Sequence, residues 1–366
     1  PLSQTMLTFA SLSNPETGQG LALAIPADSP CECELTWGDQ FGYAVRYRFG
    51  LSPDAGGDFK SRAPFRFVIY RCDGKWGLRD AARRYYAMNP AAFDKRVERE
   101  GLWLFGSPRI ELPDPDNYAF HEGGPRGWEF DEEHGIYTCP YIIPGQREIK
   151  RLEKLPASRQ EALAIFEAWE NPMPERGGAW GAEMRAIIES CLLQAPDGLP
   201  QMRIRTTDWG GDSVTFPLNA NPNLFADTDA PTIGKSQLAT VAAMHDDTPE
   251  LDGTYVDSLG AWGEYDNFRA EHFAYTRTPL SYDPTTRRPI INNRFTLLEF
   301  LWDLGDLLHE RGDLLFANGV HHNRRFHAFA CDIMGVEGHG YLEQKRAIAA
   351  QKPFLLLIYG IHTHPL

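Results

Sequence analysis

The sequence predicts a mixed α/β protein in which an all-β segment precedes a long alternation of strands and helices. Residues 1–72 contain short apolar runs separated by turn signals and show no helical period. From residue 101 onward, strand-like apolar runs alternate with helical segments almost to the end of the chain. The 366 residues are enough for two domains or for one large barrel.

The first 75 residues are expected to form part of a β-sandwich. The apolar runs Leu21–Ile25, Tyr43–Phe49 and Phe65–Tyr70 have strand length, and Asn14-Pro15 and Asp54–Gly57 supply turns between them. Three to five strands make a poor sandwich on their own. The segment 1–75 is therefore predicted to be the end of a larger β domain.

Residues 76–100 change character and are predicted to form a helical linker. Trp76, Leu78, Ala82 and Tyr85 are among the apolar residues that recur at the spacing of an amphipathic helix. Asn89-Pro90 ends this helix, because the residue before a proline is disfavoured in the helical conformation.

Residues 101–366 have the rhythm of a parallel α/β barrel. The predicted strands are Leu102–Phe105, Gly135–Tyr141, Gln201–Thr206, Gly253–Val256, Leu314–Ala317, Ala328–Ile333 and Phe354–Tyr359. The predicted helices are Arg159–Trp169, Gly181–Leu193, Lys235–His245, Thr296–Arg311 and Tyr341–Ala350. Gly312-Asp313 stops one helix before the next strand. This alternation predicts a (β/α)8 TIM barrel that is truncated, because only seven strands are recognised before the chain ends.

Charge and composition exclude several classes of function. The formal net charge is −14, which disfavours a nucleic-acid partner. No apolar run approaches the ~20 residues that a membrane-spanning helix needs. The six cysteines are scattered, and the Cys31-x-Cys33 pair alone is neither a zinc pattern nor a redox motif. The chain starts at Pro1 and stops soon after an apolar strand, so we expect it to be cut from a longer protein.

Catalytic groups of a parallel barrel gather at the carboxyl ends of its strands, so the residues found there are the candidates. Asp257 closes the apolar run Gly253–Val256, and it either caps the next turn or projects into the barrel mouth. Tyr255, Trp262 and Glu264 lie close to it in sequence. Aromatic faces beside carboxylates suit sugar rings, whose C–H faces stack while their hydroxyls take hydrogen bonds.

A second carboxylate is expected to face Asp257 from the loop after the sixth predicted strand. Glu337 is the candidate for general acid/base work, with a structural or binding role as the alternative. Asp332 is expected either to hydrogen-bond substrate or to support the residues that do. Two further strand-end residues, Asp208 and Trp209, are predicted to contact substrate, and Asn318 is predicted to contact substrate or to hold the nucleophile. For Asp208 and Asn318 the alternative is an ordinary role in a turn or loop.

Several of these segments resemble a family of large bacterial glycoside-hydrolase-like proteins. The motifs are Leu251-Asp-Gly-Thr-Tyr-Val-Asp-Ser-Leu-Gly, Asp266-x-Phe-Arg-x-Glu-His-Phe, Phe316-Ala-Asn-Gly and Asp332-Ile-Met-Gly-Val-Glu. A more distant similarity extends to the α-galactosidase and endo-α-N-acetylgalactosaminidase groups. Proteins of this kind place a β-supersandwich, similar to the galactose-mutarotase fold, before a TIM barrel. Ser61-Arg-Ala-Pro-Phe-Arg-Phe resembles the end of that sandwich.

The resemblance implies a retaining mechanism in which an aspartate on the fourth strand is the nucleophile. That role falls on Asp257. The acid/base residue of these groups is a later carboxylate, which falls on Glu337, with Asp332 and Glu264 as rivals. This chain departs from the pattern because it lacks a complete sandwich and an eighth recognisable barrel strand.

The sequence therefore predicts a secreted or periplasmic glycosidase that acts on an oligosaccharide or polysaccharide, with a neutral, galacto-configured glycan as a candidate substrate. No metal or organic cofactor is required by this reading, and the oligomeric state is left open. One alternative is a non-catalytic carbohydrate-binding protein on the same scaffold. Another is a metal-dependent barrel enzyme that uses His362, His364 and acidic strand ends.

Overall fold

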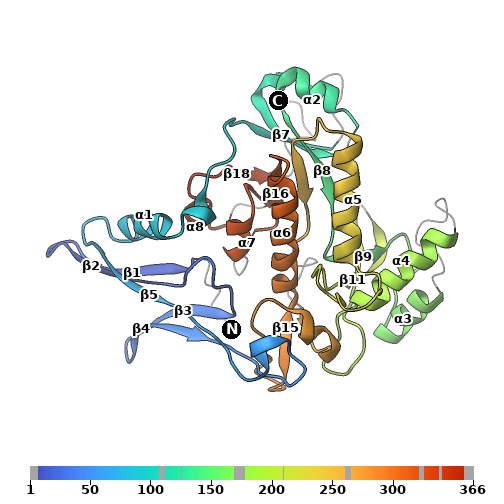
Figure 1. Ribbon diagram of the computed structural model, residues 1–366, viewed down its shortest axis with the longest axis horizontal. Coiled ribbons are helices and arrows are strands. Elements are labelled where there is room, and N and C mark those ends of the chain that lie inside the picture. Colours follow the sequence, from blue (N-terminus) through green and yellow to red (C-terminus); the bar gives the residue numbers. More distant parts are fainter. Residues whose placement is uncertain are drawn as a thin grey trace.

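The structure is a computed structural model. It describes residues 7–106, 112–124, 126–168, 178–208, 210–259, 265–320, 325–337 and 340–357, with the backbone alone for 178–181. Its two main parts are a parallel sheet with helices packed on it and a set of antiparallel strands formed by the first part of the chain (Figure 1). The parallel sheet carries the candidate site.

A seven-stranded parallel sheet confirms the predicted barrel. Its strands are β6 (Leu102–Phe105), β7 (Tyr118–Gly123), β8 (Tyr137–Ile142), β12 (Gly253–Val256), β16 (Leu314–Asn318), β17 (Ile333–Glu337) and β18 (Phe354–Leu357). They are paired in chain order from β6 to β18. The two end strands, β18 and β6, also contact each other, so within the described residues the sheet curls into a nearly closed barrel.

Two of the predicted barrel strands need correction. The run at 201–206 is a strand, β10 (Arg203–Thr207), but it belongs to a separate antiparallel sheet with β11 (Gly211–Pro217) and β9 (Gln146–Ile149). In the barrel, β8 therefore pairs directly with β12, and the seventh strand is β7, which lies between β6 and β8 and was missed in the sequence analysis. The first half of the run at 328–333 belongs to helix α7 (Arg325–Ala330), and the strand that follows, β17, starts only at Ile333.

Side chains that point into the barrel form an aromatic layer. Phe316 is completely buried there, and its ring centroid lies 4.8 Å from that of Tyr255 and 5.1 Å from that of Trp103. Gly335 makes room for this packing, because a Cβ atom at that position would lie 3.0 Å from the Phe316 ring. This layer closes the barrel interior below its carboxyl end.

The opposite faces of the strands pack against helices. The helices are α5 (Ile233–Asp247), α6 (Asn293–His309), α7 and α8 (Leu342–Ala349). Outward-facing residues such as Val256 and Ala317 are fully buried with Leu297 and Leu301 of α6. The predicted helix stop is confirmed, since α6 ends at His309 and Gly312 adopts the positive φ of 88° that suits glycine. This packing fixes the register of the strands that carry the site.

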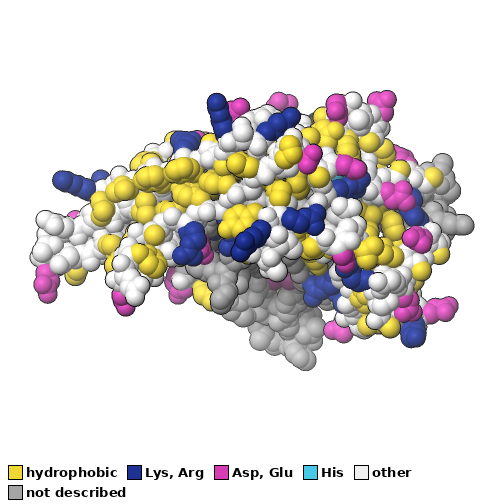
Figure 2. Space-filling model, turned by 90° about the horizontal axis from the view of Figure 1, so that it is seen from below, with side chains coloured by type: hydrophobic (Ala, Val, Ile, Leu, Met, Phe, Trp, Pro, Cys, Tyr) yellow, Lys and Arg dark blue, Asp and Glu magenta, His cyan; other side chains and the backbone are white. Residues whose placement is uncertain are grey.

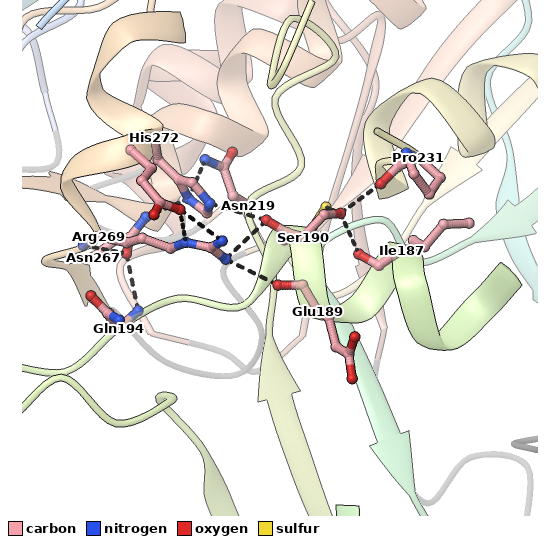
Figure 3. A network of polar contacts seen from close by, with 11 residues as sticks. Ile187, Glu189, Ser190, Gln194, Asn219, Pro231, Asn267, Arg269 and His272 are labelled. Carbon is pink, nitrogen blue, oxygen red and sulfur yellow. Dashed lines mark hydrogen bonds and ion pairs between the residues drawn. The ribbon is translucent and has the colours of Figure 1, made fainter. Parts of the chain in front are cut away.

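The antiparallel sheet β10–β11–β9 extends from the end of β8, together with helices α3 (Arg159–Ala168) and α4 (Gly178–Cys191). A network at the end of α4 joins this region to the short strand β13 (Asp266–Asn267) (Figure 3). Strand β13 forms a small sheet with β15 (Pro289–Asn292) and β14 (Ser281–Tyr282). Arg269 donates to the carbonyls of Glu189 and Ser190. The His272 Nε2 donates to the Ser190 carbonyl, while its Nδ1 accepts from Asn267. Unpaired carbonyls at the helix end are thus capped.

The first part of the chain forms a three-stranded antiparallel sheet and a hairpin. The sheet contains β1 (Phe9–Asn14), β2 (Gln19–Ala24) and β5 (Val68–Asp73), and the hairpin contains β3 (Cys33–Gly38) and β4 (Gly42–Tyr47). Helix α1 (Leu78–Met88) lies in the predicted linker and covers one face of the sheet through Ala81 and Tyr85. Many hydrophobic side chains remain exposed over this end of the molecule, among them Leu21 and Ile69 (Figure 2). No helix of the described residues is long and apolar enough to cross a membrane.

Candidate active site

Polar side chains from five neighbouring strands meet at the carboxyl end of the barrel. Each belongs to the last residues of its strand or to the residue just after it, and each lies two positions beyond an inward-facing residue of the layer below. They are Glu122 (β7), Tyr141 (β8), Asp257 (after β12), Asn318 (β16) and Glu337 (β17). Because parallel strands end on one side of a barrel, the fold brings these residues together from across the chain.

Asn318 joins the two predicted catalytic carboxylates. Its Oδ1 accepts a hydrogen bond from the Gly319 backbone N–H at 2.7 Å, which fixes the orientation of the amide. The Nδ2 therefore faces the site and donates to Asp257 Oδ1 at 2.9 Å and to Glu337 Oε1 at 2.8 Å. These two carboxylate oxygens consequently lie no more than 5.7 Å apart, which is the sum of the two distances.

Asp257 accepts hydrogen bonds on both of its oxygens. The Tyr141 hydroxyl donates to Oδ2 at 2.6 Å, and the Ser258 hydroxyl donates to the same atom at 2.8 Å. The Asp257 backbone N–H extends the pairing of β12 with β8 by donating to the Ile142 carbonyl. Ser258 then takes a φ of 57°, a strained conformation for a residue other than glycine. Asp257 is thus held by both its backbone and its side chain, with 9% of its surface exposed.

Glu122 is a third carboxyl at this site. Its side chain is almost completely buried, with 3% exposed, and it shares a hydrogen bond with the Tyr255 hydroxyl. Burial raises the pKa of Glu122 to about 8, and the nearby negative charges of Asp257 and Glu337 act in the same direction. Sequence reasoning missed Glu122 because it missed β7. An apolar run, Tyr118-Ala-Phe, that ends in a carboxylate and two glycines was the available signal.

The residue before Glu122 points away from the site. Strand alternation sends His121 outward, where its Nδ1 lies 2.6 Å from Asp131 Oδ2 and its Nε2 contacts the Gly106 carbonyl. Burial lowers the pKa of His121, but the Asp131 carboxylate outweighs that effect and the net direction is upward. The His121–Asp131 pair secures β7 against helix α2 (Trp128–His134), and so helps to hold Glu122 in place.

Two tyrosines provide hydroxyl donors beside the carboxyls. Burial raises the pKa of both Tyr141 and Tyr255, and the charge of Asp257 adds to the effect, so both phenols stay protonated at neutral pH. Tyr255 is buried in the aromatic layer, whereas the Tyr141 side chain is 41% exposed. Among the described residues, the ring of Tyr141 is therefore the aromatic surface of this site that a ligand can contact. Tyr255 is too deeply buried for that role and instead serves as a hydrogen-bond partner of Glu122.

The structure places two predicted site residues elsewhere. Asp208 is exposed in the turn after β10, outside the barrel. Asp332 precedes β17 rather than following it, so it lies at the amino end of the strand that carries Glu337 at its carboxyl end. Its Oδ2 accepts from the Leu315 backbone N–H and contacts His309 Nε2, each at 2.8 Å. The shifted boundary between α7 and β17 explains the misplacement of Asp332.

Five further predicted residues cannot be placed in the site. Trp209, Trp262, Glu264, His362 and His364 lie outside the described residues. Among the residues that are described, no group of three or more His, Cys, Asp or Glu side chains is arranged to hold a metal ion.

No family model matches the chain. No curated protein matches it either. Among solved structures, the chain is similar to a cycloalternan-degrading enzyme from Trueperella pyogenes, with 14% identity and a TM-score of 0.45 over 98% of this chain and 55% of that one. The chain therefore spans about half the length of that enzyme.

Two other similar structures are a glycoside hydrolase domain and an α-galactosidase. The glycoside hydrolase domain of PelA from Pseudomonas aeruginosa shares 15% identity, with a TM-score of 0.33 over 65% of this chain and 67% of that one. The α-galactosidase TtGalA from Thermus thermophilus shares 10% identity, with a TM-score of 0.42 over 94% of this chain and 60% of that one.

Proposed function

We propose that the chain carries the active site of a retaining glycoside hydrolase, with Asp257 as nucleophile and Glu337 as general acid/base. The observation that supports this most is the pair of carboxylates joined by Asn318. Carboxyl groups of retaining glycosidases lie about 5–5.5 Å apart, whereas those of inverting enzymes lie about 6.5–9.5 Å apart. The upper limit of 5.7 Å between the bridged oxygens of Asp257 and Glu337 favours the retaining class.

In the first step, a carboxylate oxygen of Asp257 bonds to the anomeric carbon while the glycosidic C–O bond breaks. Glu337 gives its proton to the leaving oxygen, so the aglycone departs as a neutral alcohol. In the second step, Glu337 takes a proton from water, the water oxygen bonds to the anomeric carbon, and the Asp257 carboxylate is released. Tyr141 and Asn318 hold the nucleophile in one orientation throughout.

A neutral glycan is the substrate class that this site favours. The Asp257 carboxylate would repel a uronic acid or a sulfated sugar at close range, and the net charge of −14 acts in the same direction. The exposed ring of Tyr141 offers a face for the C–H side of a sugar. A galacto-configured sugar is the first to test, because the sequence resembles the α-galactosidase group.

The decisive experiment is hydrolysis of a panel of p-nitrophenyl α- and β-glycosides, beginning with the α-galactoside. Asp257→Asn is expected to lower kcat on the order of 10⁴- to 10⁶-fold, the range found when one member of a hydrolase's catalytic group is removed. Asp208→Asn is the matched control, because it removes an exposed carboxylate outside the barrel. Proton NMR of the first-formed product should show the anomer of the substrate. Turnover that survives Asp257→Asn, or an inverted product, would overturn the assignment. Binding of a glycoside without turnover would favour the carbohydrate-binding alternative.

A further inference from the structure

We propose that Glu122 is a third functional carboxyl of this site, which in its protonated form donates a hydrogen bond from Oε2 to a hydroxyl oxygen of the bound sugar. This inference rests on the proposed function for the identity of the ligand. It assigns to Glu122 the recognition of a neutral sugar, a role separate from the two reacting carboxylates.

The first observation is an unsatisfied polar atom. One oxygen of Glu122 has Tyr255 as its partner, but Oε2 is buried and has no hydrogen-bond partner among the described residues. Buried polar atoms of folded proteins are nearly always paired, because an unpaired one costs about 1–3 kcal/mol. A carboxyl at the carboxyl end of a barrel strand, with one oxygen held and the other unpaired, is arranged for a ligand group to complete.

The second observation is the sign of the surrounding charge. The groups that act on Glu122 come from three strands: Tyr255 and Asp257 of the β12 segment, Glu337 of β17, and Tyr141 of β8. Among the described residues, the charged groups that act on Glu122 are the carboxyls of Asp257 and Glu337, and both oppose its ionisation. A third negative charge in the same buried space is unfavourable, so Glu122 keeps its proton.

The chemistry follows from that protonation state. A neutral carboxyl has one O–H donor and acceptor capacity, which matches a sugar hydroxyl, whereas an ionised carboxylate only accepts. Ionisation above about pH 8 would therefore remove the donor and add a charge beside the bound sugar. Glutamine has nearly the same shape and keeps an N–H donor at every pH, so it separates loss of the donor from loss of the side chain.

The test measures affinity in a background that cannot turn over, so that the acid/base role of Glu337 does not enter the result. Glu337→Gln is titrated calorimetrically with p-nitrophenyl α-D-galactopyranoside at pH 6 and pH 9.5. Its affinity is expected to be about 10-fold weaker at the higher pH, since burial still raises the Glu122 pKa. Glu122→Gln in the same background should bind equally at both pH values, and Glu122→Ala should bind weakly at both. Equal affinity of Glu337→Gln at both pH values, or a pH dependence that survives Glu122→Gln, would overturn the inference.

Turnover measurements keep this result apart from the proposed function. In the otherwise unaltered protein, Glu122→Ala is expected to lower kcat/KM about 10–100-fold, which corresponds to loss of one hydrogen bond in a buried site. Glu122→Gln is expected to lower it about 5-fold at pH 6. If hydrolysis depends on Asp257 and Glu122→Gln is as impaired as Glu122→Ala, the proposed function stands and the role of Glu122 is wrong. If the glycoside binds with the expected pH dependence but is not hydrolysed, the role of Glu122 stands and the hydrolase assignment is wrong.

Discussion

Replacing Glu122 by glutamine should make the protein more resistant to alkaline unfolding, with no ligand present. The glutamate is buried, its pKa is raised from 4.5 to about 8, and Oε2 has no partner among the described residues. Between these two pKa values the folded protein holds a proton that the unfolded chain has released. Stability therefore falls as pH rises from about 4.5 to about 8, and glutamine removes this dependence.

The size of the effect follows from the two pKa values. One pH unit corresponds to about 1.4 kcal/mol, so ionising Glu122 in the folded state costs about 5 kcal/mol in total. About 4 kcal/mol of this cost falls between pH 5 and pH 9. Other groups titrate over the same range, including Asp252, whose pKa burial raises to about 6. They contribute equally to both proteins and cancel in the difference.

The assay is urea unfolding followed by fluorescence at pH 5, 7 and 9 for the parent chain and Glu122→Gln. The free energy of unfolding of the variant should exceed that of the parent increasingly with pH. Glu153→Gln is the matched control, because it makes the same substitution at an exposed position. A difference between Glu122→Gln and the parent that does not change with pH would refute the reasoning, since it would mean that Glu122 ionises as freely in the folded state as in the unfolded chain.

Three further predictions concern single side chains. Tyr141→Phe removes the hydroxyl that donates to Asp257 at 2.6 Å, so kcat for any hydrolysed glycoside should fall about 10–100-fold while the melting temperature stays unchanged. An unchanged kcat would contradict the role of Tyr141 in positioning Asp257. Gly253→Ala places a Cβ atom 2.2 Å from a carbonyl oxygen of β16, so it should cost at least ~2 kcal/mol in urea unfolding, whereas Gly340→Ala, with nothing within 4 Å, should cost almost nothing. Burial and the charge of Arg269 lower the pKa of His272 from 6.5 to about 3, so between these values the unfolded chain binds a proton that the folded protein does not. The free energy of unfolding should therefore fall by about 3 kcal/mol from pH 7 to pH 4 relative to that of His272→Gln. Parallel pH profiles of the two proteins would contradict this.

Much of the barrel could be predicted because its strongest patterns are local. The apolar run Gly253–Val256 and the helical period at 296–311 correspond closely to β12 and α6. Asp257 stood out because it closes a strand that has no polar residue except a threonine. Helix periodicity and strand-end position are properties of short segments, so a single sequence is enough to reveal them.

The errors arose where a decision depended on distant partners. Propensity alone does not distinguish a barrel strand from β10, which pairs in an antiparallel sheet formed after β8. The strand β7 ends in His-Glu-Gly, a polar sequence that reads as a loop until its partners β6 and β8 are known. Asp332 was assigned to the wrong end of β17, because a shift of a few residues at a helix–strand boundary moves a carboxylate from one end of the barrel to the other.

Strand alternation couples the folding of the barrel to the assembly of its site. Each polar group of the site lies two residues after a member of the layer beneath it. The pairs are Phe120–Glu122, Cys139–Tyr141, Tyr255–Asp257, Phe316–Asn318 and Gly335–Glu337. A slip of one residue in any strand would turn its polar group toward the helices and its aromatic or small residue out of the interior. The packing free energy of the buried layer therefore also opposes misorientation of the carboxyls.

The same aromatic layer keeps water away from Glu122, and burial is the largest cause of its raised pKa. Loosening the layer, for example by truncating Phe316, should thus lower the pKa of Glu122 toward its ordinary value even though Phe316 carries no charge.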